Sequence, residues 1–337
     1  METYRTEDYH TAGEPFRIVV EGAPDLPGVT VGDRRAAAVE DPTAQRVRAI
    51  LCSEPRGHAD MYGGFLVPPD DEDAQFGVLF WHKDGFSTAC GHGTIALGAW
   101  AIHTGLVRPD PSGVTDVRID VPSGRVTARV RTDGSQVVGV DFINVPSYVL
   151  HRDVRVPTSR GDVVVDVVYG GAIYAHLEAS SVGLSVTPEN YTELIAIGRE
   201  VKHRLNGSEY AVHPEDERLS GIYGTIVFDD LGCTEDGELR QRNVTVFADG
   251  EVDRSPCGSG TASRVANLAS AGRLVPGQDL VHESIVGTVF RARIVAELSV
   301  GDRQAVEPEV SGMAYRTGRH TFELDPADPL GEGFVLR

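Results

Sequence analysis

Alternating apolar and polar residues predict short, half-buried strands over much of this chain. Val117–Val121 and Val126–Val130 follow the period of two that antiparallel strands show when one face packs on a core. Phe76–Trp81 is almost continuously apolar and predicts a strand buried on both faces. The same criteria predict further strands at residues 16–20, 137–149, 163–169, 221–228, 242–247 and 287–298, with more in the tail from 310 to 336.

Fewer segments predict helices, and one of these lacks a polar face. Arg34–Leu51 and Pro188–Arg204 carry apolar residues three and four apart, which predicts helices packed on a sheet. Thr94–Ile102 is apolar on all sides, and Ala262–Ala271 is rich in small residues. A helix without a polar face must be enclosed by protein. We therefore expect an α+β fold in which strands surround one central helix in each half.

A repeated motif precedes both of these enclosed helices. Cys90-Gly91-His92-Gly93-Thr94 and Cys257-Gly258-Ser259-Gly260-Thr261 share the pattern Cys-Gly-x-Gly-Thr and lie half a chain apart. The segment after each cysteine ends at a glycine at the same distance, Gly105 or Gly272. Recurrence of this kind indicates two similar halves with one thiol each. We place the halves at residues 1–154 together with 310–337, and at residues 155–309.

The position of the two cysteines suggests chemistry as well as structure. The first N–H groups of a helix have no partner within it, and the helix dipole favours negative charge there. Cys90 and Cys257 would therefore be favoured as thiolates, and the glycines beside them would let a bound carboxylate approach the backbone. The plainer alternative is that each cysteine is a small buried apolar residue. The repeat favours a functional role for both.

Composition narrows the range of functions. A net charge of −19 argues against nucleic acid or an anionic membrane as partner, because both call for a basic surface. No apolar run approaches the roughly 18 residues of a membrane span, and the first residues are polar, so we expect a cytoplasmic protein. Four cysteines in 337 residues do not form a disulfide scaffold. Cys52 and Cys233 lie outside any motif and are interpreted as structural.

Five motifs together resemble the proline racemase family, which includes proline racemase, 4-hydroxyproline 2-epimerase and trans-3-hydroxy-L-proline dehydratase. The resemblance extends from residue 10 to beyond residue 290. It implies the diaminopimelate epimerase-like fold, with two pseudo-symmetric α/β halves and the active site in the cleft between them. The motifs are His10-Thr11-Ala12-Gly13-Glu14-Pro15, Glu54-Pro55-Arg56-Gly57-His58, Cys90 to Thr94, Tyr169-Gly170-Gly171 and Asp253-Arg254-Ser255-Pro256-Cys257-Gly258.

The resemblance also implies roles for individual residues. Cys90 and Cys257 match the acid/base pair of the family. His92 and Asp253 match the residues that hold the ring nitrogen of the substrate. The backbone N–H groups that match the carboxylate site are those of Gly91, His92, Gly258 and Ser259. Many members have threonine in place of Ser259, a change that a backbone contact should survive. Inversion at an α-carbon needs one base and one acid on opposite faces, and no cofactor motif is visible, so we expect none.

Two activities within the family compete for this sequence. The surroundings of Cys90, together with Glu54–Gly63 and Leu219–Gly224, look more like the dehydratases. That branch typically has threonine where this chain has Cys257. A dehydratase returns no proton to the α-carbon and needs only one base, whereas an epimerase needs both thiols. On this mechanism we rank inversion of proline or 4-hydroxyproline first, and dehydration of trans-3-hydroxy-L-proline second.

Other classes of protein fit the same residues less well. Cys90, His92, Asp253 and Cys257 are of types that bind zinc, but the paired Cys-x-x-Cys spacing of structural zinc sites is absent, so we expect no metal. A non-catalytic protein that binds imino acids would use the same pocket without exchanging the α-proton. The sequence leaves the oligomeric state open, with a homodimer as one option.

Overall fold

The structure, a computed structural model, describes residues 2–336 and divides the chain into two compact units. One unit contains residues 1–140 and 313–337, and the other contains residues 141–312. The sequence predicts these boundaries near Arg155 and Val310. The first division falls earlier because strand β9 (Tyr148–Thr158) pairs along its length with β10 (Gly161–Tyr169), so both strands belong to the second unit.

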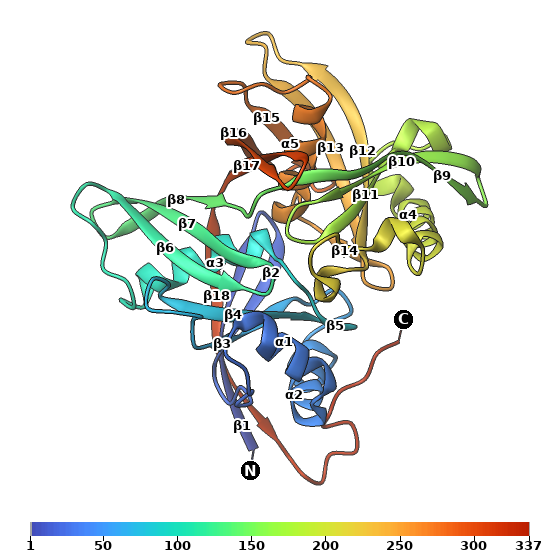
Figure 1. Cartoon of the computed structure of the whole chain (residues 1–337). Helices are drawn as coiled ribbons and strands as arrows, with labels where there is room; N and C mark the ends of the chain where they lie inside the picture. Colours follow the sequence, from blue (N-terminus) through green and yellow to red (C-terminus); the bar gives the residue numbers. More distant parts are fainter. Residues whose placement is uncertain (1, 337) are drawn as a thin grey trace. The chain divides into compact units, whose positions relative to one another are not determined.

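Strands of the first unit hydrogen-bond in the order β18, β1, β2, β3, β4, β6, β7 (Figure 1). The pairs β2–β3 and β4–β6 are parallel and the others are antiparallel. A short strand, β5, pairs with the end of β4 just before Cys90. These strands are β1 (Glu2–Thr11), β2 (Glu14–Glu21), β3 (Gly63–Val67), β4 (Phe76–His82), β5 (Gly85–Phe86), β6 (Val114–Val121), β7 (Gly124–Asp133) and β18 (Ala314–Leu324). Strand β8 (Gln136–Ile143) contains the boundary.

The second unit repeats this topology. Its strands pair in the order β9, β10, β11, β12, β13, β15, β16, β17, with β14 against β13. From β10 to β16 the pairs are antiparallel, parallel, antiparallel, parallel and antiparallel, as they are from β1 to β7. The remaining strands are β11 (Ile173–Glu178), β12 (Ile222–Cys233), β13 (Leu239–Phe247), β14 (Glu251–Asp253), β15 (Leu280–Ser284), β16 (Val289–Val300) and β17 (Arg303–Gly312).

One helix lies at equivalent points of the two topologies. α3 (Gly91–His103) connects β5 to β6, and α5 (Gly258–Ser270) connects β14 to β15. Residues 91–102 of α3 are all buried, as the lack of a polar face in this helix predicted. Residues 258–268 of α5 are all buried as well, although they include Arg264 and Asn267. Close packing needs the small residues of these helices. A Cβ on Gly98 would lie 2.6 Å from the Cβ of Ala128.

The outer helices differ from the sequence prediction at one point. The expected single helix over Arg34–Leu51 is two helices, α1 (Val31–Glu40) and α2 (Pro42–Cys52). Pro42 cannot continue a helix, and the side chain of Asp41 accepts from the N–H of Thr43 and starts α2. α4 (Tyr191–Leu205) occupies the corresponding place between β11 and β12. No helix within residues 2–336 is long and apolar enough to cross a membrane.

Candidate active site

Cys90 begins the central helix of the first unit. It is the N-cap residue of α3 in an extended backbone conformation, with φ −156° and ψ 103°. Its Sγ accepts a hydrogen bond from the backbone N–H of Gly93 at 3.2 Å, and the His92 ring nitrogens lie 3.5 and 3.6 Å from the same sulfur. A sulfur that accepts an N–H bond at a helix N-terminus is favoured as thiolate. The geometry suits Cys90 to act as a base.

Residues from three other segments of the first unit hold His92 in place. The Thr11 hydroxyl donates to the His92 carbonyl at 2.9 Å. The rings of Phe16 and Tyr62 pack edge-on against the His92 imidazole, with centroids 5.9 and 5.0 Å away. The Tyr62 hydroxyl is hydrogen-bonded to Ser87. Residues in and next to the motifs that begin at His10 and Glu54 therefore support the first turn of α3, which Cys90 caps.

Cys257 begins the central helix of the second unit in a different backbone conformation. Its φ is +64° and its ψ is 112°, a region that non-glycine residues rarely occupy. The Tyr174 hydroxyl lies 2.7 Å from the Ser259 hydroxyl and 3.8 Å from the Cys257 Sγ. Burial raises the pKa of the Cys257 thiol far above its ordinary value, and the carboxylate of Asp253 raises it further. Cys257 is therefore held as a protonated thiol.

Asp253 lies at the end of β14 and is tied to the loop that leads to Cys257. Its Oδ1 accepts hydrogen bonds from the backbone N–H and the hydroxyl of Ser255, at 2.8 and 2.7 Å. The Ser255 hydroxyl oxygen in turn accepts from the N–H of Cys257 at 3.0 Å. Asp253 is only 3% exposed, so these bonds fix the position of a buried carboxylate.

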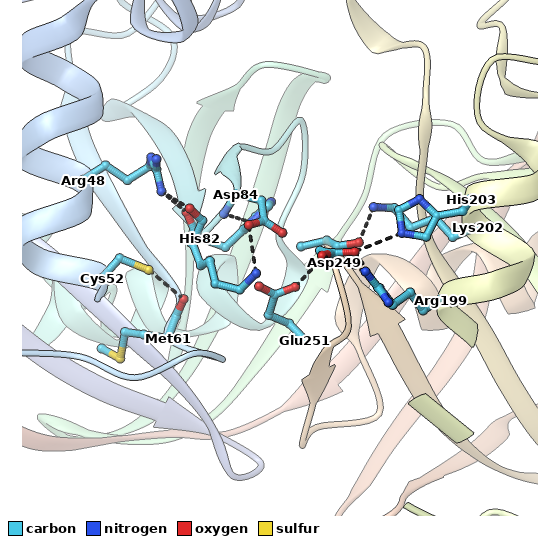
Figure 2. A network of polar contacts seen from close by, with 12 residues as sticks. Arg48, Cys52, Met61, His82, Asp84, Arg199, Lys202, His203, Asp249 and Glu251 are labelled. Atoms are coloured by element: carbon cyan, nitrogen blue, oxygen red, sulfur yellow. Dashed lines mark hydrogen bonds and ion pairs between the residues drawn. The ribbon is translucent and has the colours of Figure 1, made fainter. Parts of the chain in front are cut away.

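In both units, an outer helix anchors the turn that precedes the cysteine loop (Figure 2). In the first unit, Arg48 of α2 donates to the carbonyl oxygens of His82, at 2.8 Å, and Lys83. In the second unit, Lys202 of α4 donates to the Ala248 carbonyl, and Arg199 and His203 bind Asp249, whose pKa they lower to about 2. α2 and α4, which occupy equivalent places in the two units, thus hold the turns before β5 and β14. These are the strands that lead into the two cysteine motifs.

The structure therefore brings the expected site residues together as two groups. Cys90, Gly91 and His92 lie at the start of α3. Asp253, Cys257, Gly258 and Ser259 lie at the end of β14 and the start of α5. N–H groups in a first helical turn have no acceptor within the helix, which suits both groups to bind an anion. Within residues 2–336, no three His, Cys, Asp or Glu side chains are grouped so that they could hold a metal ion.

Sequence reasoning missed two aromatic residues of these groups, Tyr62 and Tyr174. Tyr62 lies in the Glu54–Gly63 stretch, which was noted only for its resemblance to the dehydratases. Tyr174 lies on β11 shortly after the Tyr169-Gly170-Gly171 motif, on a strand brought to α5 by long-range pairing. Their side chains reach His92 and Ser259, which makes both of them part of the candidate site.

The backbone at Cys257 leads to a prediction about stability. At a positive φ, alanine is strained and glycine is not, so Cys257→Gly should be more stable than Cys257→Ala by about 1 kcal/mol. Both variants remove the sulfur, so the difference between their stabilities reports the backbone strain at residue 257. Urea unfolding of the two purified variants measures it. An alanine variant as stable as the glycine variant would contradict the positive φ.

The buried thiol leads to a second prediction, about alkaline pH. In the unfolded chain Cys257 recovers its ordinary pKa near 9, whereas in the folded chain its pKa is higher. Above about pH 9 the unfolded chain therefore binds fewer protons than the folded one, and the free energy of unfolding falls as pH rises. The free energy of unfolding is measured with urea between pH 8 and 10.5, roughly the range over which Cys257 of the unfolded chain loses its proton. It should fall more steeply with pH for the wild type than for Cys257→Ala. Equal slopes would show that Cys257 ionises normally.

Comparison with known proteins identifies the family. A model of the proline racemase family matches residues 7–335. The chain belongs to the proline racemase family. It is 47% identical over 334 residues to trans-3-hydroxy-L-proline dehydratase of Burkholderia ambifaria and 46% identical to 3-hydroxyproline 2-epimerase of Burkholderia multivorans, with 98% of each chain covered. The crystal structure of a hydroxyproline epimerase from Agrobacterium vitis with bound trans-4-hydroxy-L-proline matches with a TM-score of 0.91 at 30% identity, over 99% of this chain and 96% of that one.

These matches confirm the resemblance to the proline racemase family and the α+β fold expected from it. The names of the matching proteins support the predicted activity only in part. From the sequence, inversion of proline or 4-hydroxyproline is expected ahead of dehydration. Relatives from Burkholderia cenocepacia and Azospirillum brasilense, each 46% identical, are again named trans-3-hydroxy-L-proline dehydratase. Among proline racemase family activities, the names therefore lean toward the dehydratase and support the isomerase only in part.

Proposed function

We propose that this protein is a dehydratase that removes water from trans-3-hydroxy-L-proline to give pyrroline-2-carboxylate. The names of its relatives support the choice of substrate. The observation that carries the choice of reaction is the unequal setting of the two thiols. Both sulfurs are buried at helix starts, but Cys90 accepts from the Gly93 N–H and lies beside the His92 ring, whereas Cys257 lies beside the Tyr174 hydroxyl and has its pKa raised by burial and by the Asp253 carboxylate. A racemase uses its two cysteines interchangeably, while an elimination needs a base on only one face of the ring.

The first step is the loss of the α-proton. In this proposal the Cys90 thiolate takes the proton from the α-carbon, and the electron pair of that C–H bond stays on the α-carbon. The substrate carboxylate, bound by the first N–H groups of α3 and α5, shares the developing charge. His92 and Asp253 hold the ring nitrogen. Because this stabilisation comes from fixed backbone dipoles, it acts without a cofactor.

The second step is the loss of the hydroxyl. The electron pair forms a double bond between the α-carbon and C3 as the C3–O bond breaks, and the departing oxygen takes one proton and leaves as water. The hydroxyl of trans-3-hydroxy-L-proline lies on the same ring face as the α-hydrogen, so the Cys90 thiol formed in the first step is proposed as the donor of that proton. The enamine that remains tautomerises to pyrroline-2-carboxylate.

One observation supports a second activity, the 2-epimerisation of 3-hydroxyproline. A thiol at residue 257 can return a proton to the opposite face of the α-carbon, which threonine would do poorly because its hydroxyl is a far weaker acid. A relative of equal similarity is named 3-hydroxyproline 2-epimerase. Both activities share the first step. They differ in whether Cys257 returns a proton to the α-carbon or the leaving hydroxyl takes a proton from Cys90.

Proton NMR in D2O tests this proposal. The enzyme is incubated separately with trans-3-hydroxy-L-proline, trans-4-hydroxy-L-proline and L-proline, and α-deuterium, inversion and pyrroline formation are followed over time. We expect pyrroline-2-carboxylate from the 3-hydroxy substrate as the main product, with cis-3-hydroxy-D-proline as a minor one. Rapid inversion of L-proline or of the 4-hydroxy substrate, without loss of water from the 3-hydroxy substrate, would reject the proposal.

A further inference from the structure

The backbone of Cys257 must be held in place by its surroundings. A non-glycine residue at φ +64° and ψ 112° is strained, and such conformations persist only where neighbouring groups over-determine them. Cys90, at the same place in the first unit, has φ −156° and ψ 103° and needs no such restraint. The question is which groups hold Cys257, and what their loss would do to its thiol.

Two buried side chains hold the peptide group that precedes Cys257. The Pro256 carbonyl accepts hydrogen bonds from the Asn243 Nδ2 and from the Thr261 hydroxyl, both at 3.0 Å. Asn243 and Thr261 are fully buried. On the other side of Cys257, its carbonyl accepts from the Thr261 N–H at 2.7 Å. Thr261 therefore bonds to the carbonyl on either side of the strained residue.

A third buried side chain orients the Thr261 hydroxyl. His282 Nδ1 lies 2.8 Å from the Thr261 Oγ1 and is fully buried. Because the Thr261 proton is donated to Pro256, the Thr261 oxygen accepts from His282, which places the ring proton on Nδ1. Burial lowers the pKa of His282 to about 3, so the ring remains neutral and keeps this tautomer. His282 comes from β15 and Asn243 from β13, a parallel pair of strands behind α5.

We propose that Asn243, Thr261 and His282, here called the Pro256 clamp, are positioning residues that hold Cys257 in its strained conformation and so fix the direction of its thiol. The inference rests on the proposed function, because it takes Cys257 as the acid that returns a proton to the α-carbon in 2-epimerisation. Cutting the clamp lets the peptide between Pro256 and Cys257 rotate toward an ordinary negative φ. That rotation relieves the strain and swings the Sγ away from its working position.

Kinetics of three threonine variants test the clamp. Thr261→Val removes the hydroxyl and keeps the shape of the side chain, and we expect kcat for 2-epimerisation of 3-hydroxyproline to fall by about a hundredfold with KM changed by less than about threefold. Thr261→Ser keeps a hydroxyl and should restore most of kcat. Thr225→Val is the matched control, because Thr225 is equally buried and donates to the Gly198 carbonyl at 2.8 Å, away from Cys257. A kcat for Thr261→Val equal to that of Thr225→Val would overturn the inference.

A stability cycle tests the same clamp without any substrate. Thr261→Val is introduced into the wild type and into Cys257→Gly, and the urea midpoint of unfolding is measured for all four proteins. In the wild type the loss of the clamp is offset by release of strain, whereas glycine at 257 has no strain to release. We expect a larger drop in midpoint in the glycine background. Equal drops, or a larger drop in the wild type, would overturn the clamp even if the dehydratase activity is found. A larger drop in the glycine background would support it even if that activity is absent. Should Thr261→Val not fold, Asn243→Ala removes the other donor to Pro256 and carries the same expectation.

Discussion

Replacing Cys90 with alanine is expected to abolish α-proton exchange, with a rate loss of about a thousandfold or more. General bases contribute about 10² to 10⁴ to an enzymatic rate, and Cys90 is the thiol of the first unit that a helix start favours as thiolate. Elimination and epimerisation both begin with this proton, so both should be lost together. Incorporation of deuterium into trans-3-hydroxy-L-proline, followed by NMR, measures the shared step directly.

Cys52→Ala is the matched control for this variant. Cys52 is a buried cysteine of the same unit, and its thiol donates to the Met61 carbonyl at 3.4 Å rather than facing a helix start. Its loss should lower stability and leave exchange intact. Exchange that persists in Cys90→Ala at near the wild-type rate would show that another group is the base, and the proposed mechanism would fail.

Replacing Cys257 with threonine is expected to separate the two activities. A threonine hydroxyl has too high a pKa to return a proton to the α-carbon efficiently, so epimerisation should fall by about a thousandfold. Elimination still needs only the Cys90 base for its first step, and departing hydroxide is easier to protonate than carbon. We therefore expect pyrroline formation to fall far less, by about tenfold. The ratio of pyrroline to cis-3-hydroxy-D-proline, measured by NMR, gives the separation.

Cys257→Ser controls for the shape of the substituted side chain. Threonine is branched at Cβ and tolerates a positive φ poorly, so part of its effect comes from strain at this backbone position. Serine lacks that branch and should give the same loss of epimerisation with a smaller loss of stability. If both variants invert the α-carbon as fast as the wild type, Cys257 is not the second acid.

The central helices could be predicted from the sequence because their signal is local. Residues 94–102 lack a polar face, and a helix of that kind can only be buried, which is how α3 is found. The repeated cysteine motif likewise foretold the repeated topology of the two units. The prediction failed at Arg34–Leu51, where apolar spacing continues across Asp41 and Pro42 although the helix ends there. Hydrophobic periodicity does not detect a cap followed by proline unless the cap is sought separately.

Much of the candidate site depends on contacts that no local pattern reports. Tyr174 reaches Ser259 because β11 pairs in parallel with β12 in the sheet that packs on α5. His282 reaches Thr261 by a similar parallel pairing of β13 with β15. The positive φ of Cys257 also lies beyond sequence reasoning, because cysteine has no preference for that region and only the surrounding hydrogen bonds impose it.

Strand β18 is made after the whole second unit, yet it lies beside β1 in the first. During translation, the earlier half of the polypeptide must therefore wait with its outermost strand uncovered while residues 141–312 leave the ribosome. An uncovered strand is a template for pairing with other chains. Nascent molecules consequently pass through an aggregation-prone interval that ends only when β18 emerges. A stop codon just before β18 should yield insoluble protein even though every residue of the candidate site has been made.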